Sequence, residues 1–485
     1  MRKPHSFDIF DTLIARRCIE SHNIFKEMEK NIKLDGFANL RIQAEAHLST
    51  GSYSIDDIYL YIEDKYKINH DVTELLKKIE IDTEINNVIG IKQNLEQVHN
   101  GDILISDMYL SPDVILKLLN KAGLDKQVGI IVSNSGKKDG DVWPKLKGMV
   151  CIEQHSGDNL HADVNSPMTH GLFAEHCLAS ALTPYEVFFR DNGFETLART
   201  VREVRLGTIS NCDGNEINQQ KLIQININIP ILIMFSVFLK MKIKKQGLSN
   251  VLFSSRDCYN LYRLFSFFND KCQWNIPSHY FYTSRISRVS PSDSYIKYFN
   301  NLATSDSAVI DLCGTGWSLG HLYERVGFYP NTFLLHDLSD TSGVKVEYEK
   351  IKKSNHNITI TSLVSNSVLN NACLEQVNYI DSGMLLDVLV LDGFCSMIPV
   401  FENPNYPEKV MKVIKNMDVV HKSFFDTLNK NDVALLIDEI ERGSNKIHGM
   451  VNELYGNLVS NMSSMHDISS YHAMQDRKSM WKLQK

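Results

Sequence analysis

The sequence predicts an α/β protein built on parallel sheets, followed by a largely helical C-terminal region. Short apolar runs, each with the length of a buried strand, alternate with helical patterns in two separate parts of the chain. Polar clusters directly follow several of these runs, which is where a parallel sheet carries its chemistry. The length of 485 residues exceeds one ordinary core and indicates two or three domains.

The first α/β pattern occupies the N-terminal part of the chain. The run 5–9 is typical of a buried parallel strand. Residues 20–98 are expected to be helical with no convincing strand, since Ile55, Ile58 and Ile62 recur at helical spacing. Strands and helices then alternate. The strands are expected at 102–105, 128–132 and 150–153, and the helices at 112–122 and 171–182.

The second α/β pattern follows a polar stretch, 206–220, which is the best candidate for a domain boundary. Beyond about residue 340 the pattern weakens, although 409–431 is helical. The last 25 or so residues are polar and are expected to be mobile. In the second pattern, strands are expected at 251–253, 279–282 and 308–312, and helices at 230–246 and 259–268.

Composition limits the classes of function. The formal net charge of −7 gives no general basic field for nucleic acid. Nine scattered cysteines form no CxxC pair, which argues against a zinc site and a disulfide framework. The longest apolar run, 230–239, is shorter than the about 20 residues of a membrane span, and we expect a buried helix there. The N-terminus does not have the pattern of a signal peptide, so we expect a cytoplasmic protein.

Four polar clusters follow four expected strands of the first pattern, and they fit phosphoryl transfer through a carboxylate. An aspartate can attack phosphorus and form an aspartyl-phosphate. A hydroxyl and an ammonium group can hold the phosphoryl oxygens, and further carboxylates can bind Mg²⁺. The clusters are Asp8 in SFDIFDTL, Ser106 in ILISDMYL, Lys137 and Lys138 in SNSGKKDGDVW, and Asp158 and Asp163 in HSGDNLHAD.

The order of these clusters resembles the four motifs of the haloacid dehalogenase (HAD) superfamily, over residues 1 to about 190. The resemblance implies a Rossmann-like domain over 1–205, with its core at 1–18 and 99–205 and a helical cap at 19–98. It implies the following roles: Asp8 as nucleophile, Thr12, Ser106 and Asp107 at the phosphate, Lys137 or Lys138 as the motif lysine, and Mg²⁺ held by Asp8, the Phe10 carbonyl, Asp158 and Asp163.

Further residues resemble a HAD subgroup found in bacterial surface-polysaccharide loci, whose biochemistry is poorly defined. The subgroup pattern therefore refines the expected fold more than the substrate. The residues are Arg16, Arg41 with Ala44-Glu45, Ile58-Tyr59, Glu80 with Glu84, and the segment SDMYLSP.

One position departs from the pattern of HAD phosphatases. Their second aspartate, two residues after the nucleophile, protonates the leaving oxygen, and here that position is Phe10. Another acid, such as Asp11, Asp107 or a cap residue, could serve instead. The leaving group could need little protonation, or the domain could bind phosphate and turn over slowly. Dehalogenases also lack the second aspartate, but they need no Mg²⁺, and Gly157-Asp158-Asn159 with Asp163 favours a metal.

A second constellation lies between residues 250 and 320. A glycine-rich turn at a helix N-terminus is an anion site, because its amides point outward. AVIDLCGTGWSLGHL loosely resembles the phosphoribosyl-diphosphate loop of type I phosphoribosyltransferases, which implies a second phosphoribosyl or nucleotide site. The alternative is a tight turn with structural arginines. The candidate residues are Arg256, Asp257, Arg285, Asp311, Gly314, Thr315, Gly316 and Ser318.

Together these observations predict a HAD-type phosphohydrolase or phosphotransferase acting on a phosphorylated small molecule, either a nucleotide or a sugar phosphate. A phosphoribosyltransferase-like α/β domain is expected over 221–340 and a mixed, largely helical region over 341–485. The alternatives are a sensor or effector module of a conflict or signalling system, which binds a phosphorylated ligand without turnover, and an interaction scaffold. Substrate identity and oligomeric state stay open.

Overall fold

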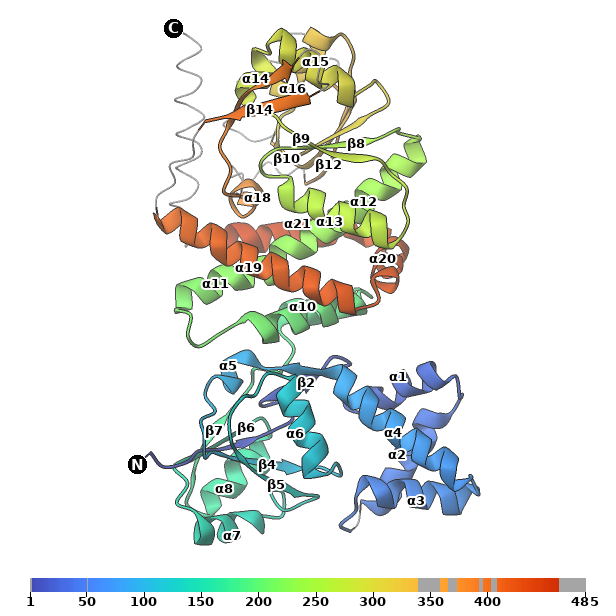
Figure 1. Ribbon diagram of the computed structural model, residues 1–485, viewed down its shortest axis with the longest axis vertical. Coiled ribbons are helices and arrows are strands. Elements are labelled where there is room, and N and C mark those ends of the chain that lie inside the picture. Colours follow the sequence, from blue (N-terminus) through green and yellow to red (C-terminus); the bar gives the residue numbers. More distant parts are fainter. Residues whose placement is uncertain are drawn as a thin grey trace. The chain divides into compact units, whose positions relative to one another are not determined.

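The structure is a computed structural model that describes residues 2–49, 51–338, 358–364, 373–391, 396–402 and 408–461 (Figure 1). The chain divides into two compact units. Unit 1 comprises Met1–Pro184 and Arg202–Gly214, and unit 2 comprises Tyr185–Val201 and Asn215–Lys485. Each unit contains a five-stranded sheet in which every pair of neighbouring strands is parallel, so the predicted α/β class is confirmed.

The sheet of unit 1 has β1 at its centre (Figure 1). Within this sheet, β4 and then β5 lie on one side of β1, and β6 and then β7 lie on the other side. The strand order therefore reverses between β1 and β6, where ligands bind in open parallel sheets. The order is β5 (Gly129–Ser133), β4 (Ile103–Asp107), β1 (Ser6–Asp8), β6 (Gln154–Gly157) and β7 (Phe173–His176).

The two faces of this sheet are buried in different clusters, because successive side chains of a strand point to opposite sides. Leu104 packs with the helix α6 (Pro112–Lys121), while Ile103 and Ile105 pack with Trp143 of α7 (Val142–Met149). Burial on both faces explains why β4 begins with a continuous apolar run, Ile103 to Ile105.

A helical block is inserted between β2 and β3, which form a short antiparallel ladder. The expectation that 20–98 holds no strand was wrong: β3 has three residues, too few to show a periodic pattern, and it pairs with a segment far away in sequence. In the order of the chain the elements are β2 (Ile14–Arg16), α1 (Asn23–Ile32), α2 (Phe37–Leu48), α3 (Ile55–Tyr66), α4 (His70–Asn87), β3 (Val88–Gly90) and α5 (Lys92–Leu95).

Two further expectations for unit 1 were wrong. The strand expected at 150–153 is instead β6, which starts at residue 154. Its side chains His155 and Ser156 are polar but buried, and His155 Nδ1 shares a hydrogen bond with the Ser6 hydroxyl of β1. The helix expected at 171–182 is instead the strand β7, an edge strand that is largely exposed and so lacks an apolar pattern. A π-helical segment, Leu160–Asn165, and α8 (Ser166–Thr169) connect these two strands.

The sheet of unit 2 has the order β12 (Ile360–Val364), β11 (Asn331–Asp337), β10 (Ala308–Gly314), β8 (Val251–Ser254), β9 (Ser278–Phe281). The order reverses between β8 and β10. The sheet continues past residue 340, because β12 pairs with β11. The helices between its strands are α13 (Tyr259–Lys271), α14 (Arg285–Val289), α15 (Asp293–Leu302) and α16 (Trp317–Val326).

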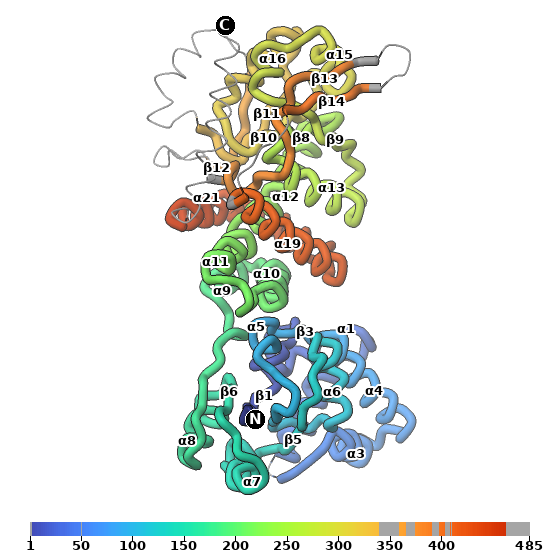
Figure 2. The backbone as a smooth tube through the Cα atoms, turned by 60° about the vertical axis from the view of Figure 1, so that its left-hand side comes forward, coloured from blue at the N-terminus to red at the C-terminus, as the bar shows by residue number. Residues whose placement is uncertain are grey.

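The helix α12 (Ile229–Gln246) packs against α13 and α21, which Figure 2 labels, and also against α20. It ends a continuous helical stretch, Asn215–Gln246, that is long and apolar enough to cross a membrane, but 89% of its most apolar window is buried inside the structure. The helix expected at 230–246, buried in the core, is therefore confirmed.

The other elements in the part of unit 2 that the structure describes are helices and an antiparallel hairpin. One of the helical segments, Gln224–Asn228, is π-helical. These elements are α9 (Pro184–Asp191), α10 (Glu195–Thr208), which continues into unit 1, α11 (Asn215–Ile223), α18 (Cys373–Gln376), β13 (Leu385–Leu391), β14 (Ser396–Phe401), α19 (Glu408–Lys430), α20 (Val433–Arg442) and α21 (Ser444–Asn461). The helix expected at 409–431 is thus confirmed. The polar tail that was expected to be mobile lies outside the described residues.

Candidate functional site

The side chain of Asp8 lies in a buried cluster at the carboxyl end of β1, next to the point where the strand order reverses. Lys137 Nζ donates hydrogen bonds to Asp8 Oδ1 and, at 2.8 Å, to Asp163 Oδ1. Three segments far apart in sequence thus meet at the site proposed from the four clusters.

The structure distinguishes the two candidate lysines. Lys137 is buried in the cluster, whereas the side chain of Lys138 is exposed. Asp107 determines this geometry, because its carboxylate accepts hydrogen bonds from the backbone N–H groups of both lysines and from the Ser133 hydroxyl at 2.5 Å. Asp107 thereby shapes the loop that carries Lys137 and Lys138.

Asp163 is held firmly in place. Its Oδ2 accepts a hydrogen bond from the Asn159 backbone N–H at 3.0 Å, and its Oδ1 lies 3.3 Å from His155 Nε2. Gly157 permits this arrangement, because a Cβ at that position would lie 2.4 Å from the Asp163 Cβ. The His155 ring in turn packs edge-on against Trp143, with the two ring centroids 4.7 Å apart.

The electrostatics of the cluster separate its carboxyl groups. Burial raises the pKa of Asp8 to about 7, with Asp163 and Asp158 adding to the effect and Lys137 opposing it. Burial would also raise the pKa of Asp163, but the hydrogen bond with His155 and the charge of Lys137 lower it to about 2. Burial would lower the pKa of Lys137, yet the two carboxylates outweigh burial and raise it.

Asp8, Asp158 and Asp163 form a group that could hold a metal ion, since carboxylate oxygens of all three lie within 4.8 Å of one another. Burial, followed by the charge of Asp11, raises the pKa of Asp158 to about 6. Lys137 neutralises only one of the three carboxylates when all are ionised. A divalent cation bound to oxygen ligands would offset the remaining charge, so the residues fit Mg²⁺.

The hydroxyls proposed for phosphate also lie at this end of the sheet. Thr12 is buried, and its Oγ1 donates to Asp158 Oδ1 at 3.4 Å. Ser106, at the carboxyl end of β4, is buried, and its hydroxyl makes no hydrogen bond to any residue that the structure describes. The Phe10 ring lies under the Arg16 guanidinium, with 4.4 Å from Cζ to the ring centroid.

Asp11 borders a cavity of about 270 Å³ that Asp158, Cys177 and Arg202 also line. Its backbone has a positive φ of 58°, and Arg202 Nη2 lies 3.7 Å from its Oδ1. Burial raises its pKa, and the charges of Arg202 and Arg16 oppose the rise. Asp11 is therefore an acid beside Asp158, at a cavity that a ligand could enter.

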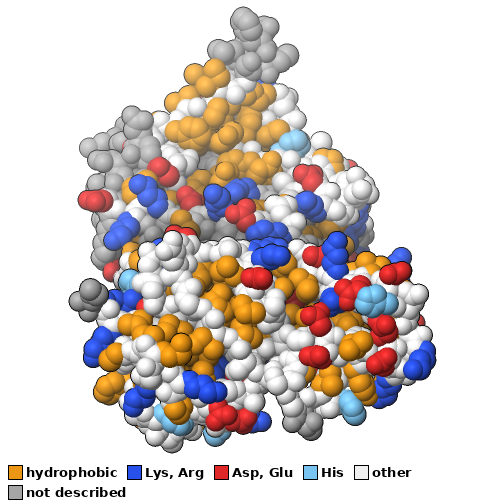
Figure 3. Space-filling view, turned by 60° about the horizontal axis from the view of Figure 1, so that its bottom comes forward, with side chains coloured by type: hydrophobic (Ala, Val, Ile, Leu, Met, Phe, Trp, Pro, Cys, Tyr) orange, Lys and Arg blue, Asp and Glu red, His pale blue; other side chains and the backbone are white. Residues whose placement is uncertain are grey.

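The subgroup residues of the helical block form a buried ionic network instead of lining the site. Arg41 donates to both carboxylate oxygens of Glu80, at 2.7 and 2.8 Å, and Tyr59 donates to the same group at 2.7 Å. Arg16 pairs in the same way with Glu84, at 2.8 to 3.2 Å. On the surface of unit 1, by contrast, acidic side chains gather over the helical block (Figure 3).

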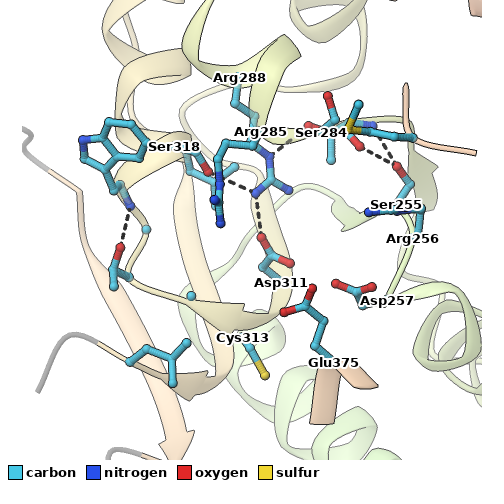
Figure 4. A pocket seen from close by; sticks show the side chains of 18 residues that line it. Ser255, Arg256, Asp257, Ser284, Arg285, Arg288, Asp311, Cys313, Ser318 and Glu375 are labelled. Atoms are coloured by element: carbon cyan, nitrogen blue, oxygen red, sulfur yellow. Dashed lines mark hydrogen bonds and ion pairs between the residues drawn. The ribbon is translucent and has the colours of Figure 1, made fainter. Parts of the chain in front are cut away.

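The second constellation also converges on a cavity, of about 430 Å³, in unit 2 (Figure 4). All eight residues expected there line it: Arg256, Asp257, Arg285, Asp311, Gly314, Thr315, Gly316 and Ser318. Sequence reasoning missed two charged residues of the lining. Arg288, one helical turn after Arg285, could have been found from that spacing, whereas Glu375 comes from the distant α18 and gave no signal.

No protein-family model matches this sequence, and no curated protein is significantly similar to it.

Proposed function

We propose that unit 1 is a Mg²⁺-dependent phosphohydrolase or phosphotransferase of the HAD type that acts on a phosphorylated small molecule. The observation that carries the proposal is the convergence of Asp8, Lys137, Asp158 and Asp163 at the point where the strand order reverses. In this proposal the helical block α1–α4 is the cap that selects the substrate. A cytoplasmic location belongs to the same proposal.

The chemistry begins with the ionised carboxylate of Asp8, whose oxygen attacks phosphorus as the bond to the leaving oxygen breaks. The Lys137 ammonium and the Ser106 hydroxyl hold the phosphoryl oxygens. Bound Mg²⁺, held by Asp8, Asp158 and Asp163 with the Phe10 carbonyl, would screen the repulsion between two anions. Water, or an acceptor alcohol in a transferase, then releases the phosphoryl group from Asp8.

The proton on the leaving oxygen needs a donor, because Phe10 cannot supply one. Asp11 is the candidate, since it borders the cavity beside Asp158 and burial raises its pKa. A dehalogenase is disfavoured by the three-carboxylate group, because that chemistry uses no cation to offset the charge.

A second candidate function is a sensor that binds a phosphorylated ligand with little turnover. The packing of Phe10 under Arg16 favours it, because an apolar ring occupies the position of the usual acid. In that case Asp8 and the metal group would hold the ligand without completing the cycle.

The test is reaction of the full chain with Mg²⁺ and BeF₃⁻, which mimics a phosphoryl group on a carboxylate, combined with a panel of phosphate esters. We expect a fluoroberyllate adduct on Asp8 and ester hydrolysis that Asp8→Asn abolishes. An adduct without hydrolysis would favour the sensor. If no adduct forms, and Asp8→Asn hydrolyses esters as fast as the parent, the proposal fails.

A further inference from the structure

A buried histidine that the proposed chemistry does not use lies behind Asp163. His155 belongs to β6, and its side chain is fully buried. Its Nδ1 lies 2.9 Å from the Ser6 Oγ, and its Nε2 lies 3.3 Å from Asp163 Oδ1. Ser6 is the residue of β1 directly opposite His155 in the parallel ladder. The ring therefore connects the central strand of the sheet to a carboxylate of the cluster around Asp8.

The partners of this ring determine which nitrogen carries the proton. An ionised carboxylate accepts hydrogen bonds and donates none, so the ring must donate to Asp163 from Nε2. In the neutral ring Nδ1 then has no hydrogen, and it accepts a hydrogen bond from the Ser6 hydroxyl. A tautomer fixed in this way has one orientation in which both nitrogens are satisfied.

Packing prevents the ring from turning away. Trp143 lies edge-on against it, with 4.7 Å between the ring centroids, and neither side chain is exposed. Trp143 Nε1 donates to Ser166 Oγ at 2.9 Å, and Ser166 Oγ donates to the Lys137 carbonyl at 3.0 Å. The same buried contacts thus hold the imidazole ring and the backbone of Lys137 in one arrangement.

His155 supplies one of three donors that fix the carboxylate of Asp163. Oδ1 accepts from Lys137 Nζ at 2.8 Å and from His155, and Oδ2 accepts from the Asn159 backbone N–H at 3.0 Å. Lys137 also bonds Asp8, so the position of Asp163 decides how the ammonium is shared between the two carboxylates. Without His155, only the long Lys137 side chain restrains Oδ1, and the oxygens no longer keep the spacing that a small cation needs.

We propose that His155, held by Ser6, is a positioning residue for Asp163 and sets the affinity of the carboxylate group for Mg²⁺. It touches neither the substrate nor the cation, and it acts through Asp163. The inference rests on the proposed function of unit 1, which assigns Mg²⁺ to Asp8, Asp158 and Asp163. Partners that hydrogen-bond a metal-binding carboxylate commonly change metal affinity by about 10- to 100-fold.

The test is calorimetric titration of the full chain with Mg²⁺ in the absence of any substrate. His155→Phe keeps an aromatic ring in the buried position and removes both hydrogen bonds, so we expect it to weaken Mg²⁺ binding about tenfold or more. Ser6→Ala removes the hydroxyl behind the ring and should weaken binding about threefold. His161→Phe is the matched control, because His161 is exposed in the same π-helical segment as Asp163, and it should bind as the parent does.

Two further variants separate positioning from a loss of packing. His155→Gln places an amide donor near the position of Nε2, so its loss of Mg²⁺ affinity should be smaller than that of His155→Phe. In a chain that already carries Asp163→Asn, His155→Phe should change the affinity by less than about twofold, because the carboxylate through which His155 acts is absent. Circular dichroism checks that each variant is folded, and Ser6→Ala decides the test if His155→Phe is not.

Three results would overturn the inference. The first is a folded His155→Phe protein, or failing that a Ser6→Ala protein, that binds Mg²⁺ as tightly as the parent. The second is an equal loss in His155→Phe and His155→Gln, because the ring then matters for packing alone. The third is an undiminished effect of His155→Phe in the Asp163→Asn chain, because the ring then acts through another residue.

Failure of the proposed function gives a different result, because it concerns the parent chain. A parent that binds no Mg²⁺ and forms no fluoroberyllate adduct at Asp8 would overturn the function of unit 1, and the role of His155 with it. A parent that binds Mg²⁺ with an affinity that none of the variants changes would overturn the role of His155 alone.

Discussion

At the scale of single residues, Lys137 decides whether the carboxylates around Asp8 can share one site. Its ammonium bonds both Asp8 and Asp163 and is almost completely buried. Lys137→Ala would leave buried carboxylates uncompensated, so at pH 8 and without Mg²⁺ we expect a loss of about 3–5 kcal/mol of unfolding free energy. Chemical denaturation measures this loss.

Lys138→Ala is the matched control for that change, because the neighbouring side chain is exposed. Its stability should stay within about 0.5 kcal/mol of the parent. Added Mg²⁺ should recover part of the loss in Lys137→Ala, since a bound cation stabilises the folded state. If the two variants are equally stable without Mg²⁺, the Lys137 contacts do not hold the site together.

Asp11 gives a second prediction at this scale. If it protonates the leaving oxygen, Asp11→Asn should slow hydrolysis of alkyl phosphates by about 10²-fold or more. Hydrolysis of a nitrophenyl phosphate should slow much less, because the nitrophenolate leaving group needs little protonation. Steady-state rates on the two esters measure the difference. The exposed Asp113→Asn is the control, and equal losses on both esters would exclude the role of Asp11 as acid.

At the scale of elements, the helical block is held by ion pairs inside it. Glu80 accepts from Arg41 and Tyr59, and the carboxylate and guanidinium of this pair are both fully buried. Glu80→Gln should therefore lower the free energy of unfolding by about 3–5 kcal/mol, because it leaves the Arg41 charge buried with a weaker partner. Thermal or urea unfolding measures the loss.

Glu74→Gln, in the same helix α4, is the matched control, since Glu74 pairs with Lys77 at the surface. It should cost less than about 1 kcal/mol. If the two substitutions cost the same, the buried network contributes nothing beyond a surface pair.

The comparison of expected and observed elements shows which physical signals the sequence carries. β4, β8 and β10 could be predicted because burial on both faces makes each of them begin with a continuous apolar run. β7 could not, because it is an exposed edge strand. β6 was misplaced because hydrogen bonds bury its polar side chains, and no hydropathy pattern marks such bonds.

The same limit applies to the candidate sites. Residues at or next to the ends of predicted strands, such as Asp8 and Ser106, could be placed at the sheet end from the sequence alone. The choice between Lys137 and Lys138 could not be made, because it depends on how Asp107 folds the loop. Glu375 reaches its cavity only through the tertiary fold, so spacing along the chain gives no information about it.

At the scale of the whole molecule, two buried histidines make stability depend on pH. His336 and His421 lie in unit 2. Both ring nitrogens of His336, and Nε2 of His421, have no hydrogen-bond partner among the residues that the structure describes. Burial lowers the pKa of His336 to about 4, with Asp337 opposing it. Burial, with the charge of Arg263, lowers the pKa of His421 to about 3. Both rings are therefore neutral in the folded protein near neutral pH.

An unfolded histidine binds a proton below its ordinary pKa of about 6.5, whereas these folded ones do not, so the unfolded state binds more protons as the pH falls. The stabilisation is complete above pH 6.5 and is lost as the pH falls toward the folded values. By linkage, each histidine should lower the free energy of unfolding by roughly 2 kcal/mol when the pH falls from 7 to 5. In denaturation curves at the two pH values, His421→Gln should lose less stability on acidification than the parent, while the exposed His448→Gln should match the parent. An identical pH dependence in all three proteins would mean that His421 is protonated inside the fold.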